Sequence, residues 1–127
     1  MITSPYQKYQ QTQAQTASKP KLLIMLYDGA IRFVNIGIEG VEERNIEKAN
    51  NNFCKAQAII NELIASLNFN YSISTDLLSI YEYMLNRLVE ANIKKNKDIA
   101  MEVLEHLSEL REAWVEVARS PGMIAEG

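Results

Sequence analysis

The hydrophobic residues between Leu22 and Val41 predict an α-helix that carries two apolar stripes. When the segment is stepped at about 100° per residue, most of them fall on one broad face, with a narrow polar strip opposite. The broad face comprises Leu22, Leu23, Leu26, Ala30, Phe33, Val34, Gly37 and Val41. A second stripe comprises Ile24, Tyr27, Ile31 and Ile38. One stripe is enough for a helix of a bundle. Two stripes indicate either a central helix or a helix that offers one stripe to a partner.

Capping residues set the expected limits of this helix and of the next one. Ser18 is a favourable N-cap, so we expect the first helix to begin there and to end at Glu42 or Glu43. Asn45 is the expected N-cap of the second helix. The apolar residues of that helix recur at three- and four-residue steps and are Ile46, Ala49, Phe53, Ala56, Ile60, Leu63, Ile64 and Leu67.

The second half of the chain predicts two more helices. Residues 68–74 break the periodicity with turn-forming residues, and we expect Phe69 and Ile73 to pin this loop to the core. The third helix is expected to begin at Ser74 or Thr75, with Leu77, Leu78, Tyr81, Met84, Leu85, Leu88 and Val89 on its apolar face. The fourth follows a lysine cluster and places Ile99, Val103, Leu107, Leu110, Trp114 and Val117 together. The sequence Ser-Pro-Gly at 120–122 ends it.

Four helices of about twenty residues joined by short loops predict an all-α fold, an antiparallel up-and-down four-helix bundle. We expect the bundle to span residues 18–118, between a mobile N-terminal arm (1–17) and a flexible C-terminal tail (119–127). The arm is rich in glutamine and has too little apolar surface to order itself. Within it, Tyr6 and Tyr9 are either two solvated tyrosines or a docking element that packs on the domain.

Length and charge limit the classes of protein to which this chain can belong. The 127 residues suit one domain, and a net charge of −3 argues against nucleic acid as a partner. The basic cluster Lys94, Lys95 and Lys97 fits a helix end, where cations interact favourably with the helix dipole. One cysteine, Cys54, is weak support for a reducing compartment. Without a signal-peptide pattern or a sufficiently long apolar run, we expect a cytoplasmic protein with no stable membrane insertion.

The sequence carries little that predicts a reaction. It has no phosphate-binding glycine motif. The chain has one histidine and one cysteine, which are too few for a His/Cys metal site. We therefore expect no enzyme, no cofactor and no metal. His106 leaves one alternative, a histidine-phosphotransfer bundle, but Glu105 and Glu109 beside it would oppose an incoming phosphoryl group.

Several polar and apolar positions remain unexplained by a bundle core alone. Asn92 falls on the middle of an apolar face, where its amide needs partners, and we expect it to fix a neighbouring turn. Large apolar residues outside the core stripes include Ile80, Tyr83, Ile93, Leu104 and Val115. A groove that accepts an amphipathic or extended peptide would explain several of them together.

The same segments resemble the flagellin export chaperone family, FliS. The likeness begins with Thr-Ala-Ser at 16–18 and LLIMLYDGAIRF at 22–33. It continues through KAQAIINEL at 55–63, ASLNF at 65–69, YEYMLNRLVEAN at 81–92 and LSELREAW at 107–114. Tyr6 and Tyr9 resemble the tyrosines of that family's mobile N-terminal arm. The loop 70–74 departs from the family, whose members tend to have a glycine-rich, acidic segment there.

This resemblance implies a non-enzymatic cytoplasmic chaperone. Its client would be the disordered C-terminal segment of flagellin, which it would keep from polymerising and deliver to the flagellar type III export gate. Family members are also linked to the assembly factor FliW, and a weak homodimer is left open. The residues that we expect to touch a partner are Tyr6, Tyr9, Ile24, Tyr27, Asp28, Ile31, Tyr81, Tyr83, Arg87 and Asn92.

Overall fold

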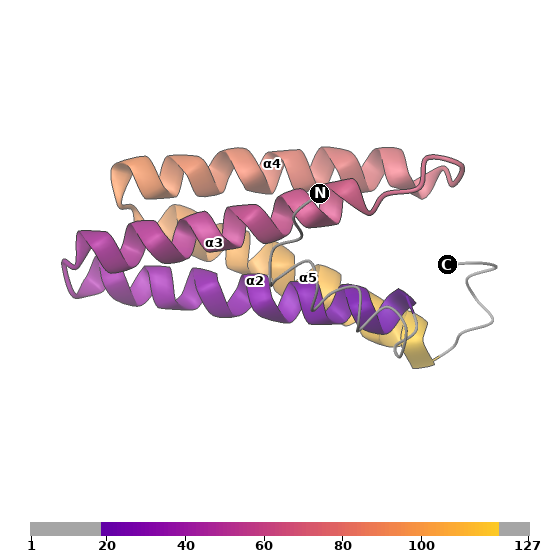
Figure 1. Ribbon diagram of the computed structural model, residues 1–127, viewed down its shortest axis with the longest axis horizontal. Coiled ribbons are helices and arrows are strands. Elements are labelled where there is room, and N and C mark those ends of the chain that lie inside the picture. Colours follow the sequence, from indigo (N-terminus) through magenta and orange to yellow (C-terminus); the bar gives the residue numbers. More distant parts are fainter. Residues whose placement is uncertain (1–18, 120–127) are drawn as a thin grey trace, which may run out of the picture.

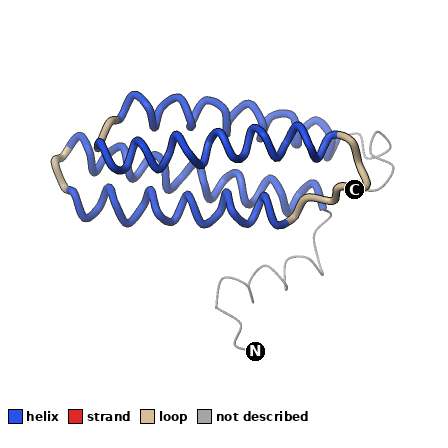
Figure 2. Tube along the Cα trace, turned by 90° about the horizontal axis from the view of Figure 1, so that it is seen from above, coloured by secondary structure: helices blue, strands red, loops and turns tan. Residues whose placement is uncertain are grey.

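The computed structural model describes residues 19–119, which form four helices and no strand (Figure 1). These helices are α2 (Lys19–Glu42), α3 (Ile46–Ala65), α4 (Ile73–Lys94) and α5 (Lys97–Arg119). Each packs against its neighbours in the chain, and α5 also packs against α2, so the bundle closes. Helices α2 and α4 therefore face each other across one diagonal, and α3 and α5 across the other. Figure 2 shows the same antiparallel arrangement from above. The predicted all-α four-helix bundle is confirmed.

Asparagine side chains begin two of the helices. The Asn45 side chain accepts a hydrogen bond from the Lys48 backbone N–H at 3.0 Å, which confirms the predicted cap of α3. At the start of α5, Asn96 Oδ1 accepts from the backbone N–H groups of Asp98 and Ile99 at 2.9 and 3.2 Å. Lys95, with φ of 51°, ends α4 in the left-handed conformation.

Helix α4 begins at Ile73, earlier than the predicted Ser74 or Thr75. The preceding loop supplies the reason, because Asn68 orders it from within. Its side chain accepts from the Asn70 backbone N–H at 2.9 Å, and its carbonyl accepts from the buried Ser74 hydroxyl at 2.6 Å. Polar contacts therefore hold the loop. The expected apolar pins are wrong, since Phe69 is 60% exposed and Ile73 is 58% exposed.

The core runs the length of the bundle, and two glycines let α2 and α3 approach closely. A Cβ atom at Gly37 would lie 2.5 Å from the Phe53 ring, and one at Gly40 would lie 2.6 Å from the backbone nitrogen of Ala49. The core consists of Leu23, Leu26, Tyr27, Ala30, Val34, Ala49, Phe53, Ala56, Ile59, Ile60, Leu63, Leu77, Tyr81, Met84, Leu88, Ala91, Ala100, Val103 and Leu107.

Three further residues differ from their predicted places. Tyr27, expected outside the core on the second stripe, has no exposed surface. Ile46 and Val89, expected to be core residues, are 68% and 37% exposed. Ile46 is the first residue of α3, at an end of the bundle. Val89 lies about 100° around the helix from the buried Leu88, which takes it past the edge of the contact face.

Candidate partner-binding surface

Exposed apolar side chains gather on α4. Of the nine large hydrophobic residues exposed in the described part of the chain, five belong to this helix. They are Ile73, Ile80, Tyr83, Val89 and Ile93. Ile73 and Ile80 are seven residues apart and lie on one side of the helix, and Tyr83 follows three residues later. An uncovered apolar side on one helix of a bundle is a surface that a partner can cover.

An open groove of about 370 Å³ lies beside this surface, between α4 and α5. Helix α4 contributes Ser79, Ile80 and Tyr83 to its lining. Helix α5 contributes His106, Glu109 and Leu110. The isoleucine and the leucine offer apolar contact, whereas the other side chains bring hydrogen-bonding groups. This combination suits a peptide side chain with a polar neighbour.

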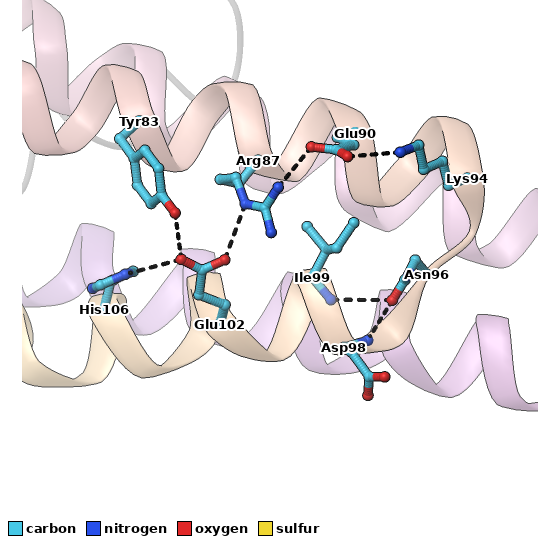
Figure 3. Close-up of polar contacts among 9 residues, drawn as sticks. All are labelled: Tyr83, Arg87, Glu90, Lys94, Asn96, Asp98, Ile99, Glu102 and His106. Atoms are coloured by element: carbon cyan, nitrogen blue, oxygen red, sulfur yellow. Dashed lines mark hydrogen bonds and ion pairs between the residues drawn. The ribbon is translucent and has the colours of Figure 1, made fainter.

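Glu102 is the polar centre of the contact between α4 and α5 (Figure 3). Its carboxylate accepts from the Tyr83 hydroxyl at 2.5 Å and from Arg87 Nε at 3.0 Å, and His106 Nε2 lies 3.5 Å away. The hydrogen bonds from Tyr83 and Arg87 lower the pKa of the Glu102 carboxyl group. The Tyr83 ring meets His106 edge to face, with centroids 5.9 Å apart. These contacts fix the tyrosine at the rim of the groove.

The polar row continues along α4 beyond Arg87. Arg87 Nη1 also donates to Glu90 at 2.7 Å, and Lys94 donates to the same carboxylate at 2.8 Å (Figure 3). Lys94, followed by Arg87, lowers the pKa of Glu90. The two predicted contact residues Tyr83 and Arg87 therefore lie together in one network at the α4–α5 edge.

Tyr27 and Tyr81 occupy a different place, in the core. Their hydroxyl groups lie 2.5 Å apart, and burial raises the pKa of both. A hydrogen bond from Trp114 on α5 partly opposes the shift at Tyr27. Because both tyrosines are almost completely buried, neither presents surface to a partner in this conformation.

Asp28 lies at a different edge of the bundle, where α2 meets α5. Asp28 forms an ion pair with Arg111. A second ion pair joins Glu42 to Lys97 at 3.3 Å. Glu42 follows Asp28 by 14 residues on α2, and Lys97 precedes Arg111 by 14 residues on α5. The equal spacing is the one that two antiparallel helices require. Ile31, three residues after Asp28, is partly buried and packs against the core. Ile24, one turn before Asp28, is also partly buried.

Asn92 is buried at the end of α4 and has the partners that its position requires. Its amide nitrogen donates to Asn50 of α3 at 2.9 Å, and its side-chain oxygen accepts from Lys95 at 2.8 Å. Lys95 also donates to the Asn92 carbonyl at 2.6 Å. The side chain thus joins α3 to the turn after α4, as the expected role in a neighbouring turn requires. Tyr6 and Tyr9 lie outside the described residues.

The sequence did not single out Glu102, the residue that organises this surface. Its partners Tyr83 and Arg87 are 19 and 15 residues away in the chain. A pair that crosses between helices leaves no local periodicity to detect. The four-residue spacing from Glu102 to His106 was the one readable signal, since residues at that spacing face each other on a helix.

The described residues contain little suited to catalysis. No group of three or more His, Cys, Asp and Glu side chains in residues 19–119 could hold a metal ion. Cys54 is exposed, and its sulfur lies 3.8 Å from Asn50. A phosphoryl group on His106 Nε2 would face the Glu102 carboxylate across 3.5 Å, which opposes the phosphotransfer alternative.

No described helix is both long enough and apolar enough to cross a membrane.

Comparison with known proteins identifies relatives along almost the whole chain. The family model described as flagellar protein FliS matches residues 2–121. The flagellar secretion chaperone FliS of Bacillus subtilis is 38% identical over 119 residues, which cover 94% of this chain and 90% of that protein. The protein of the same name from Campylobacter jejuni is 32% identical over 88% of this chain and 89% of its own. The Salmonella typhimurium protein, also so named, is 32% identical over 81% of this chain and 78% of its own.

Proposed function

The chain belongs to the FliS family, and we propose that it is a cytoplasmic chaperone for flagellin that binds the disordered C-terminal segment of this client. Family membership supports a chaperone role in flagellar export. The relatives carry the name flagellar secretion chaperone, and the matched region includes all four helices.

The observation that carries the client site is the apolar side of α4 beside the α4–α5 groove. Ile80 and Tyr83 of α4 are 38% and 47% exposed. Leu110 of α5 lines the other side of the groove. A disordered segment that folds on binding must offset about 2–5 kcal/mol of ordering cost by burying apolar surface. A row of uncovered apolar side chains on a rigid helix provides such surface without prior rearrangement.

The rim of this site adds polar recognition. Tyr83 and Arg87 are held by Glu102, so their positions are set before a client arrives. Preorganised side chains lose little freedom on binding, which favours affinity. Flagellin bound here would be kept from polymerising and passed to components of the type III export gate, with FliW as a further partner. Tyr6 and Tyr9 would belong to an arm that competes with or joins the client.

Calorimetry with a peptide from the flagellin C-terminus tests this proposal. We expect binding with a negative heat-capacity change, because apolar surface is buried on both partners. A scrambled peptide of the same composition is the control and should give no binding heat. Equal heats from the two peptides, or none from either, would refute sequence-specific client binding. The heats measured at several chain concentrations also test for a weak homodimer.

A further inference from the structure

The aliphatic lining of the α4–α5 groove lies next to a carboxylate. Ile80 of α4 and Leu110 of α5 are the two aliphatic residues of the lining, and Glu109 is the acidic one. Ile80 is 38% exposed, and Glu109 is exposed as well. A side chain that enters this open groove therefore meets an aliphatic surface and a negative charge together.

Glu109 has no cation to neutralise it. None of the ion pairs in the described part of the chain includes its side chain. Arg111, two residues later, pairs with Asp28 at the α2–α5 edge. Arg87, the arginine of the α4–α5 network, is held by two other carboxylates. The negative charge at the groove is therefore left for a partner to balance.

The polar neighbours of Glu109 in the lining favour a donor as the partner group. The Tyr83 hydroxyl donates its proton to Glu102 at 2.5 Å, so its oxygen remains as an acceptor (Figure 3). His106 Nε2 lies 3.5 Å from the same carboxylate. The Ser79 hydroxyl can accept as well as donate. A carboxylate from a partner would face Glu109 and find the tyrosine proton already engaged.

The combination of aliphatic surface and unpaired carboxylate selects one class of side chain. A purely apolar side chain would cover Ile80 and Leu110, but it would also remove water from Glu109 without replacing its hydrogen bonds, which costs free energy. Lysine and arginine lay their methylene stems on apolar surface and keep the charged head at its edge. Their hydrogen bonds to a carboxylate are stronger than those between neutral groups.

We propose that the α4–α5 groove binds a lysine or arginine side chain of the client segment. The methylene stem lies against Ile80 and Leu110, and the cationic head donates to Glu109 and to the Tyr83 hydroxyl oxygen. This inference rests on the proposed client role and adds the class of residue that the groove recognises. The other exposed apolar residues of α4 remain available for apolar side chains of the same segment.

Charge reversal in the groove, measured by calorimetry against two peptides, tests this assignment. One peptide is the flagellin C-terminal segment, and the other has norleucine in place of each lysine and arginine, which keeps a stem and removes the charge. An exposed ion pair contributes up to about fivefold to affinity, and reversal adds a repulsion. Glu109→Lys should therefore weaken the first peptide about tenfold and change the second less than about twofold.

Glu105→Lys is the matched control for this experiment. Glu105 is exposed on the same helix, four residues before Glu109, and does not line the groove. The substitution changes the net charge equally. Because salt screens exposed charges over about 8 Å at physiological ionic strength, it should weaken the first peptide by no more than about threefold.

Several results would overturn the assignment while flagellin binding stands. These are equal losses from Glu109→Lys and Glu105→Lys, no loss from Glu109→Lys, or equal affinity of the natural chain for the two peptides. A flagellin C-terminal segment that binds but contains no lysine or arginine would overturn it as well. Absence of heat from the unmodified peptide is a different outcome, because it refutes the client role together with this inference.

Discussion

The hydroxyl groups of Tyr27 and Tyr81 meet at 2.5 Å across the diagonal of the bundle. Tyr27 belongs to α2 and Tyr81 to α4, two helices whose backbones are not neighbours in the bundle. Within residues 19–119, no buried side-chain nitrogen or oxygen lacks a hydrogen-bond partner. The tyrosine pair meets this requirement in the centre of the core, where each hydroxyl satisfies the other.

Removing one of these hydroxyl groups should cost more than removing both. We expect Tyr27→Phe to lower the free energy of unfolding by about 1–3 kcal/mol, because the Tyr81 hydroxyl is left buried without its partner. The double variant Tyr27→Phe/Tyr81→Phe should recover part of this loss, since no orphaned hydroxyl remains. Urea unfolding followed by circular dichroism measures the single variants Tyr27→Phe and Tyr81→Phe and the double variant. Strictly additive losses would show that the two side chains do not act as a pair.

The same pair should make the protein sensitive to alkali. Burial raises the pKa of both tyrosines above the value of about 10 that they have in the unfolded chain. Above pH 10 the unfolded chain therefore releases protons that the folded protein retains, and stability falls as the pH rises. Unfolding midpoints between pH 9 and pH 11 should drop for the natural sequence and drop less for Tyr27→Phe/Tyr81→Phe. Parallel curves would contradict this origin of the effect.

The helices were predictable from the sequence because their signals are local. Asn45 as a cap and the three- and four-residue recurrence from Ala49 to Leu63 concern neighbours within one helix. The misplacement of Tyr27 had a different cause. Its angle on α2 lies at the edge of the broad stripe, and only the position of the diagonal helix α4 decides that it is buried. Periodicity in one helix cannot supply that position.

The candidate site was predictable only in part, for the same reason. Tyr83 was singled out as an apolar residue off the core stripe, and it lines the groove. Glu102 was missed because its role depends on partners from another helix. Ile73 was expected to pin the loop to the core, yet the polar contacts of Asn68 order the loop and Ile73 is exposed. Long-range partners and loop hydrogen bonds decided each of these outcomes.

Glu102 should contribute stability that is lost in acid. Hydrogen bonds from Tyr83 and Arg87 lower its pKa in the folded protein, so its contribution is present above the unfolded value of about 4.3 and disappears as the pH falls through the lower folded value. Unfolding midpoints between pH 6 and pH 3 should therefore fall less for Glu102→Gln than for the natural sequence. Glu105→Gln removes an exposed carboxylate from the same helix and is the control. An equal effect from both variants would assign the change to net charge.

Two glycines of α2 should respond differently to alanine. A Cβ atom at Gly40 meets the Ala49 backbone at 2.6 Å, which cannot move without shifting α3, so Gly40→Ala should destabilise by about 1–3 kcal/mol. At Gly29 the nearest atom is the far end of the Ile59 side chain, at 3.0 Å. Gly29→Ala should therefore be near neutral, or stabilising by up to about 1 kcal/mol through helix propensity. Thermal unfolding distinguishes the two, and equal losses would show that the Ile59 side chain cannot adjust.

The client site on α4 makes a prediction about one exposed isoleucine. Ile80 lines the groove and is 38% exposed, so Ile80→Asp should fold normally while placing a charge where the client's apolar side chains would be buried. We expect the affinity for a flagellin C-terminal peptide to fall about tenfold, which corresponds to about 1.4 kcal/mol.

Ile46→Asp is the matched control, because Ile46 is 68% exposed at the start of α3 and does not line the groove. Its affinity should stay within about twofold of the natural sequence in calorimetry, as expected for a surface change away from the site. If both variants bind the peptide equally well, the client is bound elsewhere on the bundle. If both lose affinity equally, the added charge acts through the overall field of the protein, and the groove has no special role.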